Sequence, residues 1–164
     1  MPFKIGDKIV YPNHGVTIVE LIAESSINGS RHTYYHLRLL ANNSKLMVPA
    51  ENTDRIGLRR LYKQQEIKGL FSLLEMRVGT GASDWKDRYR ENLEKMKTGK
   101  LEDVADVLRN LNQVSKRKSL SFREKKMYDR AKYLLISEIA IVKNIPEVEA
   151  EGLIEKSLNK SLGH

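Results

Sequence analysis

The spacing of apolar residues changes once along this chain of 164 residues, near Leu58. Before that point, apolar and polar residues alternate in short runs rich in β-branched side chains, which is typical of half-buried strands. After it, apolar residues recur at intervals of three and four, as they do on one face of an α-helix. The sequence therefore predicts an α+β protein in two parts, with a small β-domain followed by an all-α domain.

Turn signals divide the first part into short strands. Asn28-Gly29 favours a tight hairpin, and the segment 11–15 contains both Pro and Gly. Four or five strands within about 60 residues predict a strongly bent sheet or SH3-like barrel. Pro49 places the strand it ends at a sheet edge, where it is either protected or available to a partner's strand. The strands that we expect are 3–10, 16–22, 33–40 and 45–49.

Caps and breakers divide the second part into helices. Gly99 is a stop signal, Ser121-Phe122-Arg123-Glu124 is a capping-box pattern, and Pro146 precedes acidic residues as at a helix start. We expect a bundle of four to five helices. The predicted organisation is a β-domain over 1–58, a helical connector with a glycine-containing joint over 59–82, and a helical domain over 83–164.

The residues show no pattern of catalysis or metal binding. The chain has no cysteine, and His14, His32 and His36 have no spacing that indicates a metal site. We find no nucleophile–base pair and no phosphate-binding loop, so we expect neither an enzyme nor a cofactor. No apolar run is long enough for a membrane span, and Met1–Asp7 lacks the apolar region of a secretory signal. We therefore expect a cytoplasmic protein.

Positive charge is concentrated in the first part of the helical half. The chain has a formal net charge of +8, and residues 85–132 alone contribute +7. This stretch opens with the single tryptophan, Trp85, followed by Lys86, Arg88 and Arg90. Trp85 could begin an apolar core stripe with Tyr89, or it could stack on or wedge between bases while the cations contact phosphates. Three separate basic elements favour a duplex-binding surface over a merely solvated face.

Several segments resemble the CarD family of bacterial transcription regulators, in the same order along the chain. The segment that begins at Trp85 resembles the tryptophan helix of that family. The resembling segments are 3–7, 10–15, 48–52, 85–95, 104–111 and 120–127.

The resemblance implies a Tudor-like N-terminal domain that docks on the β subunit of RNA polymerase and is shared with the transcription-repair coupling factor. It implies that the helical domain contacts promoter double-stranded DNA at the upstream edge of the bubble. Trp85 would wedge into the minor groove and stabilise the open complex. The expected polymerase-binding residues are Leu37, Lys45, Met47 and Pro49. The expected DNA-binding residues are Trp85, Lys86, Arg88, Tyr89, Arg90, Phe122, Arg123, Lys125 and Lys126.

Two positions depart from the family pattern. Asp87 stands where many relatives carry a basic residue, and Met47 stands where some relatives carry an arginine. Our hypothesis is a monomeric, non-catalytic regulator that is associated with the nucleoid through RNA polymerase. The alternative is a general basic nucleic-acid-binding or architectural protein that does not dock on the polymerase.

Overall fold

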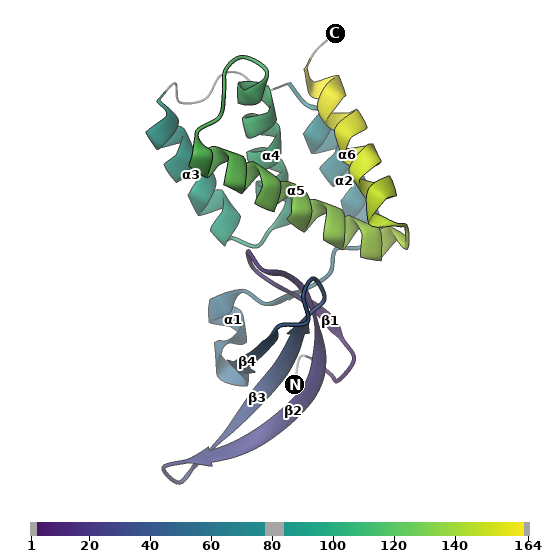
Figure 1. The fold of residues 1–164 in the computed structure, drawn as a ribbon. Helices are drawn as coiled ribbons and strands as arrows, with labels where there is room; N and C mark the ends of the chain where they lie inside the picture. Colours follow the sequence, from purple (N-terminus) through teal and green to yellow (C-terminus); the bar gives the residue numbers. More distant parts are fainter. Residues whose placement is uncertain (1–2, 78–83, 163–164) are drawn as a thin grey trace. The chain divides into compact units, whose positions relative to one another are not determined.

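The computed structural model describes residues 3–77 and 84–162. The chain divides into two compact units, Met1–Leu61 and Tyr62–His164. The first is a β-sheet unit and the second is a helical bundle (Figure 1). This arrangement confirms the predicted α+β class with its small barrel-like sheet and helical bundle.

The first unit is built on a fully antiparallel sheet of five strands in the order β4-β3-β2-β1-β5. β2 and β3 form a long curved hairpin that extends well beyond the shorter β4 (Figure 1). Because β4 comes first in this strand order, it is an edge strand, as Pro49 at its end predicts. The strands are β1 (Lys8–Tyr11), β2 (Gly15–Ile27), β3 (Ser30–Leu39), β4 (Lys45–Pro49) and β5 (Arg59–Arg60).

The hairpin turn between β2 and β3 is the one that the sequence predicts. Ile27 pairs with Ser30, which leaves Asn28 and Gly29 as a two-residue loop with φ values of 52° and 79°. Both central residues of a type I′ turn need positive φ, and Asn-Gly adopts it at little cost. The turn fixes the register of the hairpin, and with it the face on which each side chain lies.

The first unit has a hydrophobic core of its own. The rings of Phe3 and Tyr35 meet edge to face with centroids 5.7 Å apart. A 3-10 turn, η1 (Ala50–Asn52), and a short helix, α1 (Thr53–Ile56), return the chain to β5, which pairs with β1. The helical pattern that we read from Leu58 onward is therefore wrong at its start, since Arg59 and Arg60 complete the sheet.

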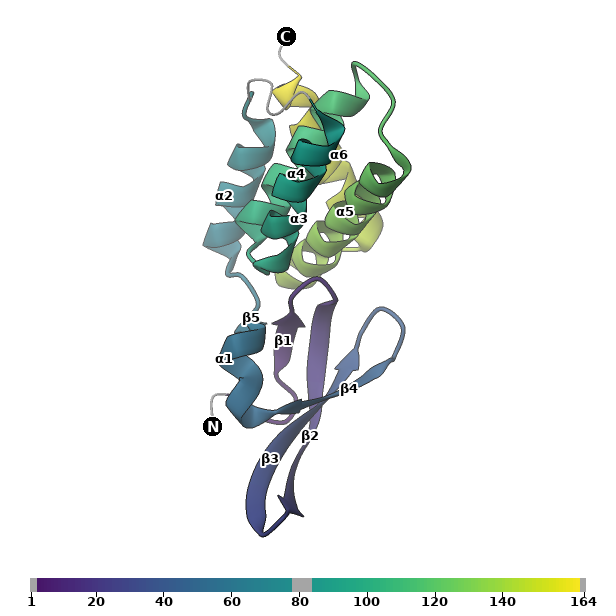
Figure 2. The same ribbon diagram turned by 90° about the vertical axis from the view of Figure 1, so that its left-hand side faces the viewer.

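The described residues of the second unit form five helices. α4 has α2, α3 and α5 as neighbours (Figure 2). Ser121 and Glu124 form the predicted capping box at the start of α5, and Gly99 has φ 75° just after α3. The helices are α2 (Gln64–Glu75), α3 (Trp85–Lys97), α4 (Leu101–Ser115), α5 (Phe122–Lys143) and α6 (Glu147–Ser161).

α2 is packed into this bundle. Its apolar residues Ile67, Leu70 and Leu74 are buried in the same core as α4, α5 and α6. We expected residues 59–82 to be a connector, and in the structure α2 packs against α4 and α6. The glycine-containing joint at 78–82 lies outside the described residues. Among the described helices, none is long and apolar enough to cross a membrane.

Candidate nucleic-acid interface

α3 presents Trp85 at its first helical position. Asp84 caps the helix by accepting a hydrogen bond from the backbone N–H of Lys86 at 3.1 Å. The Trp85 side chain keeps 40% of its surface exposed. The buried stripe of α3 instead contains Arg88, Asn92 and Met96. Trp85 therefore does not begin the core stripe, which was the simpler of its two interpretations.

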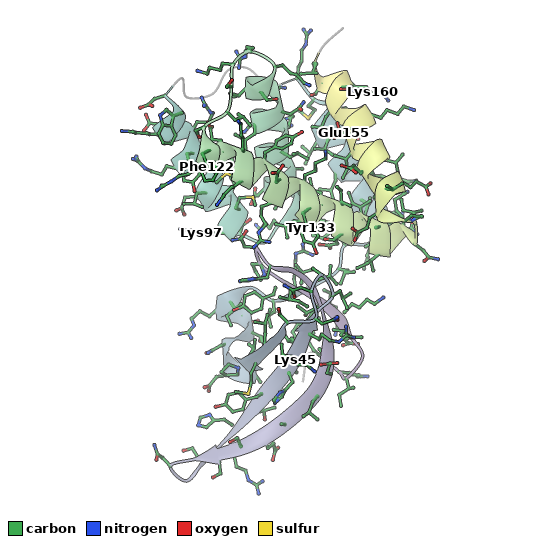
Figure 3. The ribbon with its side chains drawn as sticks, viewed as in Figure 1. Lys45, Lys97, Phe122, Tyr133, Glu155 and Lys160 are labelled. Carbon is green, nitrogen blue, oxygen red and sulfur yellow. The ribbon has the colours of Figure 1, made fainter. Side chains whose placement is uncertain are left out.

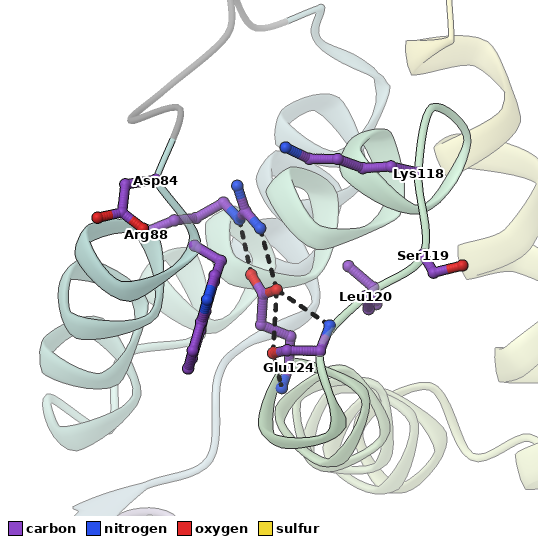
Figure 4. Close-up of a pocket in the computed structure, with 8 residues that line it drawn as sticks. Asp84, Arg88, Lys118, Ser119, Leu120 and Glu124 are labelled. Atoms are coloured by element: carbon purple, nitrogen blue, oxygen red, sulfur yellow. Dashed lines mark hydrogen bonds and ion pairs between the residues drawn. The ribbon is translucent and has the colours of Figure 1, made fainter.

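Arg88 is turned inward to a carboxylate on α5. Its Nε donates to Glu124 Oε2 at 2.6 Å and its Nη2 donates to Glu124 Oε1 at 3.0 Å (Figure 4). Both residues are buried, Glu124 completely. We expected Arg88 to contact DNA phosphates. In the structure its guanidinium is instead buried and held in this two-pronged ion pair with Glu124.

The same carboxylate also caps α5. Glu124 Oε1 accepts from the Ser121 backbone N–H at 3.3 Å and from the Ser121 hydroxyl at 3.2 Å. Burial by itself raises the pKa of Glu124, but the hydrogen bonds from Arg88 and Ser121 outweigh it and leave the pKa below its usual value. Hydrogen bonding to Glu124 raises the pKa of Arg88 against the opposing effect of burial. The pair is therefore ionised at neutral pH.

α5 begins with a second exposed aromatic residue. Phe122 lies at the first helical position with 72% of its surface exposed (Figure 3). The Lys126 ammonium lies 4.6 Å from the centre of its ring, and the Arg123 guanidinium lies 5.9 Å from the Tyr89 ring on α3. Cations held over aromatic rings keep their charge available to an anionic ligand. Tyr89 and Phe122, both candidates from the sequence, are thus parts of a mixed aromatic and basic surface.

The remaining predicted cations differ in their surroundings. Arg90 lies 3.7 Å from the Asp87 carboxylate, and both side chains are exposed. Within the described part of the chain, the ammonium groups of Lys86 and Lys125 form no ion pair. Exposed, unpaired ammonium groups are suited to phosphate contact.

A pocket of about 330 Å³ opens between the starts of α3 and α5. It is lined by Trp85, the Arg88–Glu124 pair and the segment Lys118 to Ser121. Figure 4 shows Lys118 and Leu120 across the pocket from Asp84. Lys118 and Glu124 were not among our site candidates. Lys118 belongs to a visible basic run, but nothing in the sequence indicates that Glu124 binds α3. No three described His, Asp or Glu residues are grouped so that they could hold a metal ion.

The candidate residues on the first unit fall into two groups. Lys45, Met47 and Pro49 alternate along β4 and share the outward face, whereas Leu37 is buried in the sheet core. Leu37 is therefore wrong as a contact residue, because alternation in β3 directs its side chain inward. Lys45 and Arg38 bind the carboxylate of Glu20 at 2.9 and 3.0 Å, and their hydrogen bonds lower its pKa.

A row that contains two exposed apolar residues, Leu21 and Met47, crosses the sheet beside these charges. Leu21 pairs with His36, and His36 pairs with Met47, so the three lie side by side on the outward face. Leu21 is 48% exposed and was missed by the sequence analysis. Only the strand register could have identified it.

Comparison with known proteins decides the family. The family model "CarD, C-terminal domain" matches residues 69–155, and the model "CarD-like/TRCF RID domain" matches residues 3–62. The chain belongs to the CarD family. The protein named "Putative transcription factor YdeB" of Bacillus subtilis (strain 168) is 35% identical over 145 residues, which are 88% of this chain and 95% of that protein. Membership in this family of transcription factors supports a role in transcription regulation.

Two solved structures resemble the N-terminal part. The N-terminal domain of CarD from Myxococcus xanthus is 33% identical, with a TM-score of 0.31 over 35% of this chain and 77% of that one. CdnLNt from the same organism is 40% identical, with a TM-score of 0.32 over 37% of this chain and 84% of that one.

Proposed function

We propose that the protein is a non-catalytic transcription regulator that bridges the β subunit of RNA polymerase and promoter DNA. The helical bundle contacts the duplex at the upstream edge of the melted region, and Trp85 enters the minor groove there. By occupying the unstacked step, the indole hinders collapse of the bubble and lengthens the life of the open complex. The protein works as a monomer in the cytoplasm, on the nucleoid.

One observation carries this proposal. An exposed indole, an exposed phenyl ring and several cations come together at the starts of α3 and α5. Proteins that bend or unstack DNA from the minor groove insert apolar side chains and neutralise neighbouring phosphates. Trp85 and Phe122 are the apolar side chains that would insert. Lys86, Lys125 and Lys126 would neutralise the neighbouring phosphates.

The energetics explain why a second partner is needed. Unstacking a base step costs a few kcal/mol, and phosphate contacts weaken steeply as salt increases. We therefore expect weak binding to free duplex DNA at physiological salt and strong dependence on the polymerase. The first unit supplies docking through β4, where Lys45, Met47 and Pro49 share one face of an edge strand.

The test is the lifetime of the open complex on a promoter with an unstable bubble, using purified polymerase. The wild-type protein should lengthen the lifetime, and Trp85→Ala should not, although it still folds and binds polymerase. Equal lengthening by both would remove Trp85 from the mechanism. No lengthening by either, together with tight binding to free duplex, would favour the alternative of a general basic DNA-binding protein.

A further inference from the structure

The two exposed aromatic residues stand on helices that are joined by one buried contact. Trp85 opens α3, and Arg88 follows it by three residues, which is nearly one helical turn. Phe122 opens α5, and Glu124 follows it by two residues. The Arg88–Glu124 ion pair therefore links the first turn of one helix to the first turn of the other.

The geometry of this contact restricts movement. A guanidinium that donates two parallel hydrogen bonds to one carboxylate fixes both the distance and the relative orientation of the two groups. The Glu124 carboxylate is held in addition by the backbone N–H and the hydroxyl of Ser121. A single side chain thus caps α5 and binds α3.

Stability alone is a poor explanation for such a pair. Burying two charges costs desolvation energy that their attraction only partly offsets, and an apolar pair of similar volume is often equally stable. What an apolar pair lacks is a directional constraint.

We propose that Arg88 and Glu124 are positioning residues whose buried ion pair sets the placement of Trp85 and Phe122 toward DNA. This inference rests on the proposed function. In it, Arg88 acts through Trp85 and makes no phosphate contact of its own.

Two variants separate positioning from other roles. Glu124→Gln keeps an acceptor for the α5 cap and keeps the Arg88 charge, but it removes the ionic partner. The double variant Arg88→Met/Glu124→Leu removes both charges together, so no buried charge is left unpaired. Arg109→Met is the matched control: Arg109 is also buried, but it binds Asp106 and the Leu73 carbonyl, on α4 and α2.

Three measurements are made on the full chain. Urea unfolding establishes that each variant is folded. Acrylamide quenching of fluorescence reports the surroundings of Trp85, which is the only tryptophan. The lifetime of the polymerase open complex reports function. We expect both pair variants to change the quenching and to lose about tenfold in lifetime, the equivalent of one aromatic stacking contact. Arg109→Met should change neither, whatever its stability.

The outcomes are separable. Unchanged quenching in the folded double variant overturns the inference, and so does changed quenching with a wild-type lifetime. A Glu124→Gln variant that lengthens the open-complex lifetime also overturns it, because the released Arg88 would then be acting as a phosphate contact. If the wild-type protein itself has no effect on lifetime, the proposed function fails, while the quenching comparison still decides whether the pair positions Trp85.

Discussion

Val19 and Leu21 are two positions apart in β2, yet their side chains lie on opposite faces of the sheet. Val19 is 1% exposed and pairs with Leu37, whereas Leu21 is 48% exposed and pairs with His36. The register shifts between them, because Glu20 is the extra residue of a β-bulge. Regular alternation would have buried Leu21. The bulge instead adds it to the exposed row with His36 and Met47.

This row gives a prediction for polymerase binding. Met47→Glu and Leu21→Glu should each weaken binding to the polymerase by roughly tenfold, as expected when a charge enters the apolar centre of an interface. Ile5→Glu is the control, since Ile5 is 62% exposed and Met47 is 61% exposed in the same unit. A pulldown with the isolated β subunit measures the effect. Equal loss in all three variants would show that the outward face of β2–β4 is not the docking surface.

A second prediction concerns Asp87. Its carboxylate lies 3.7 Å from Arg90 on the surface proposed to face DNA. Asp87→Asn should release Arg90 and remove a repulsive charge, which would raise affinity for duplex DNA roughly two- to fivefold. The slope of log affinity against log salt should steepen by about one.

Glu94→Gln is the control for that prediction, because Glu94 pairs with Lys97 at the other end of α3. A fluorescence-anisotropy titration at several salt concentrations measures both quantities. If the two variants give the same slope, Asp87 does not limit phosphate contact.

Phe122 gives a third prediction. Phe122→Ala should shorten the open-complex lifetime by about fivefold, because one exposed ring is removed from the surface that contacts DNA. The free energy of unfolding of the Phe122→Ala variant should differ from wild type by less than about 0.5 kcal/mol, as is usual for exposed sites. Val148→Ala on α6, which is also highly exposed, should leave the lifetime unchanged. Lifetime and urea unfolding are measured together, and a stability loss in Phe122→Ala would indicate a packing role instead.

The fourth prediction concerns pH and the contact between α5 and α6. Lys132 on α5 binds Glu155 and, at 3.1 Å, Glu151 on α6. Burial alone lowers the pKa of Lys132, but these carboxylates outweigh it and raise the pKa to about 12. Because the folded-state pKa is the higher one, this stabilisation is complete below the unfolded value, about 10.5, and disappears as pH rises through 12.

Lys132→Met should therefore lower the free energy of unfolding by about 1 kcal/mol at pH 8, after allowance for solvent screening of the partly exposed carboxylates. The difference from wild type should shrink as the pH approaches 12. Lys160→Met is the control, since Lys160 pairs with Glu75 through an exposed contact. Urea unfolding at pH 8, 10 and 11.5 measures these differences, and a difference that stays constant with pH would contradict the assignment.

Local signals predicted the parts of the fold that depend on neighbouring residues. Asn28-Gly29 predicted the hairpin turn and Ser121 with Glu124 predicted the start of α5, because each motif satisfies its own backbone groups. The same signals failed at Arg59 and Arg60. That two-residue strand exists only because β1 is available to pair with it.

The sequence by itself determined the two-part architecture, the helix starts and the concentration of basic charge around Trp85. All of these follow from periodicity, capping and composition over short distances. Tertiary structure alone decided that Arg88 binds Glu124, which is 36 residues away, and so is buried. It also decided that Leu37 points inward and Leu21 outward. These outcomes depend on packing and register between separate elements, and no local pattern encodes which partner a charge will meet or where a strand will bulge.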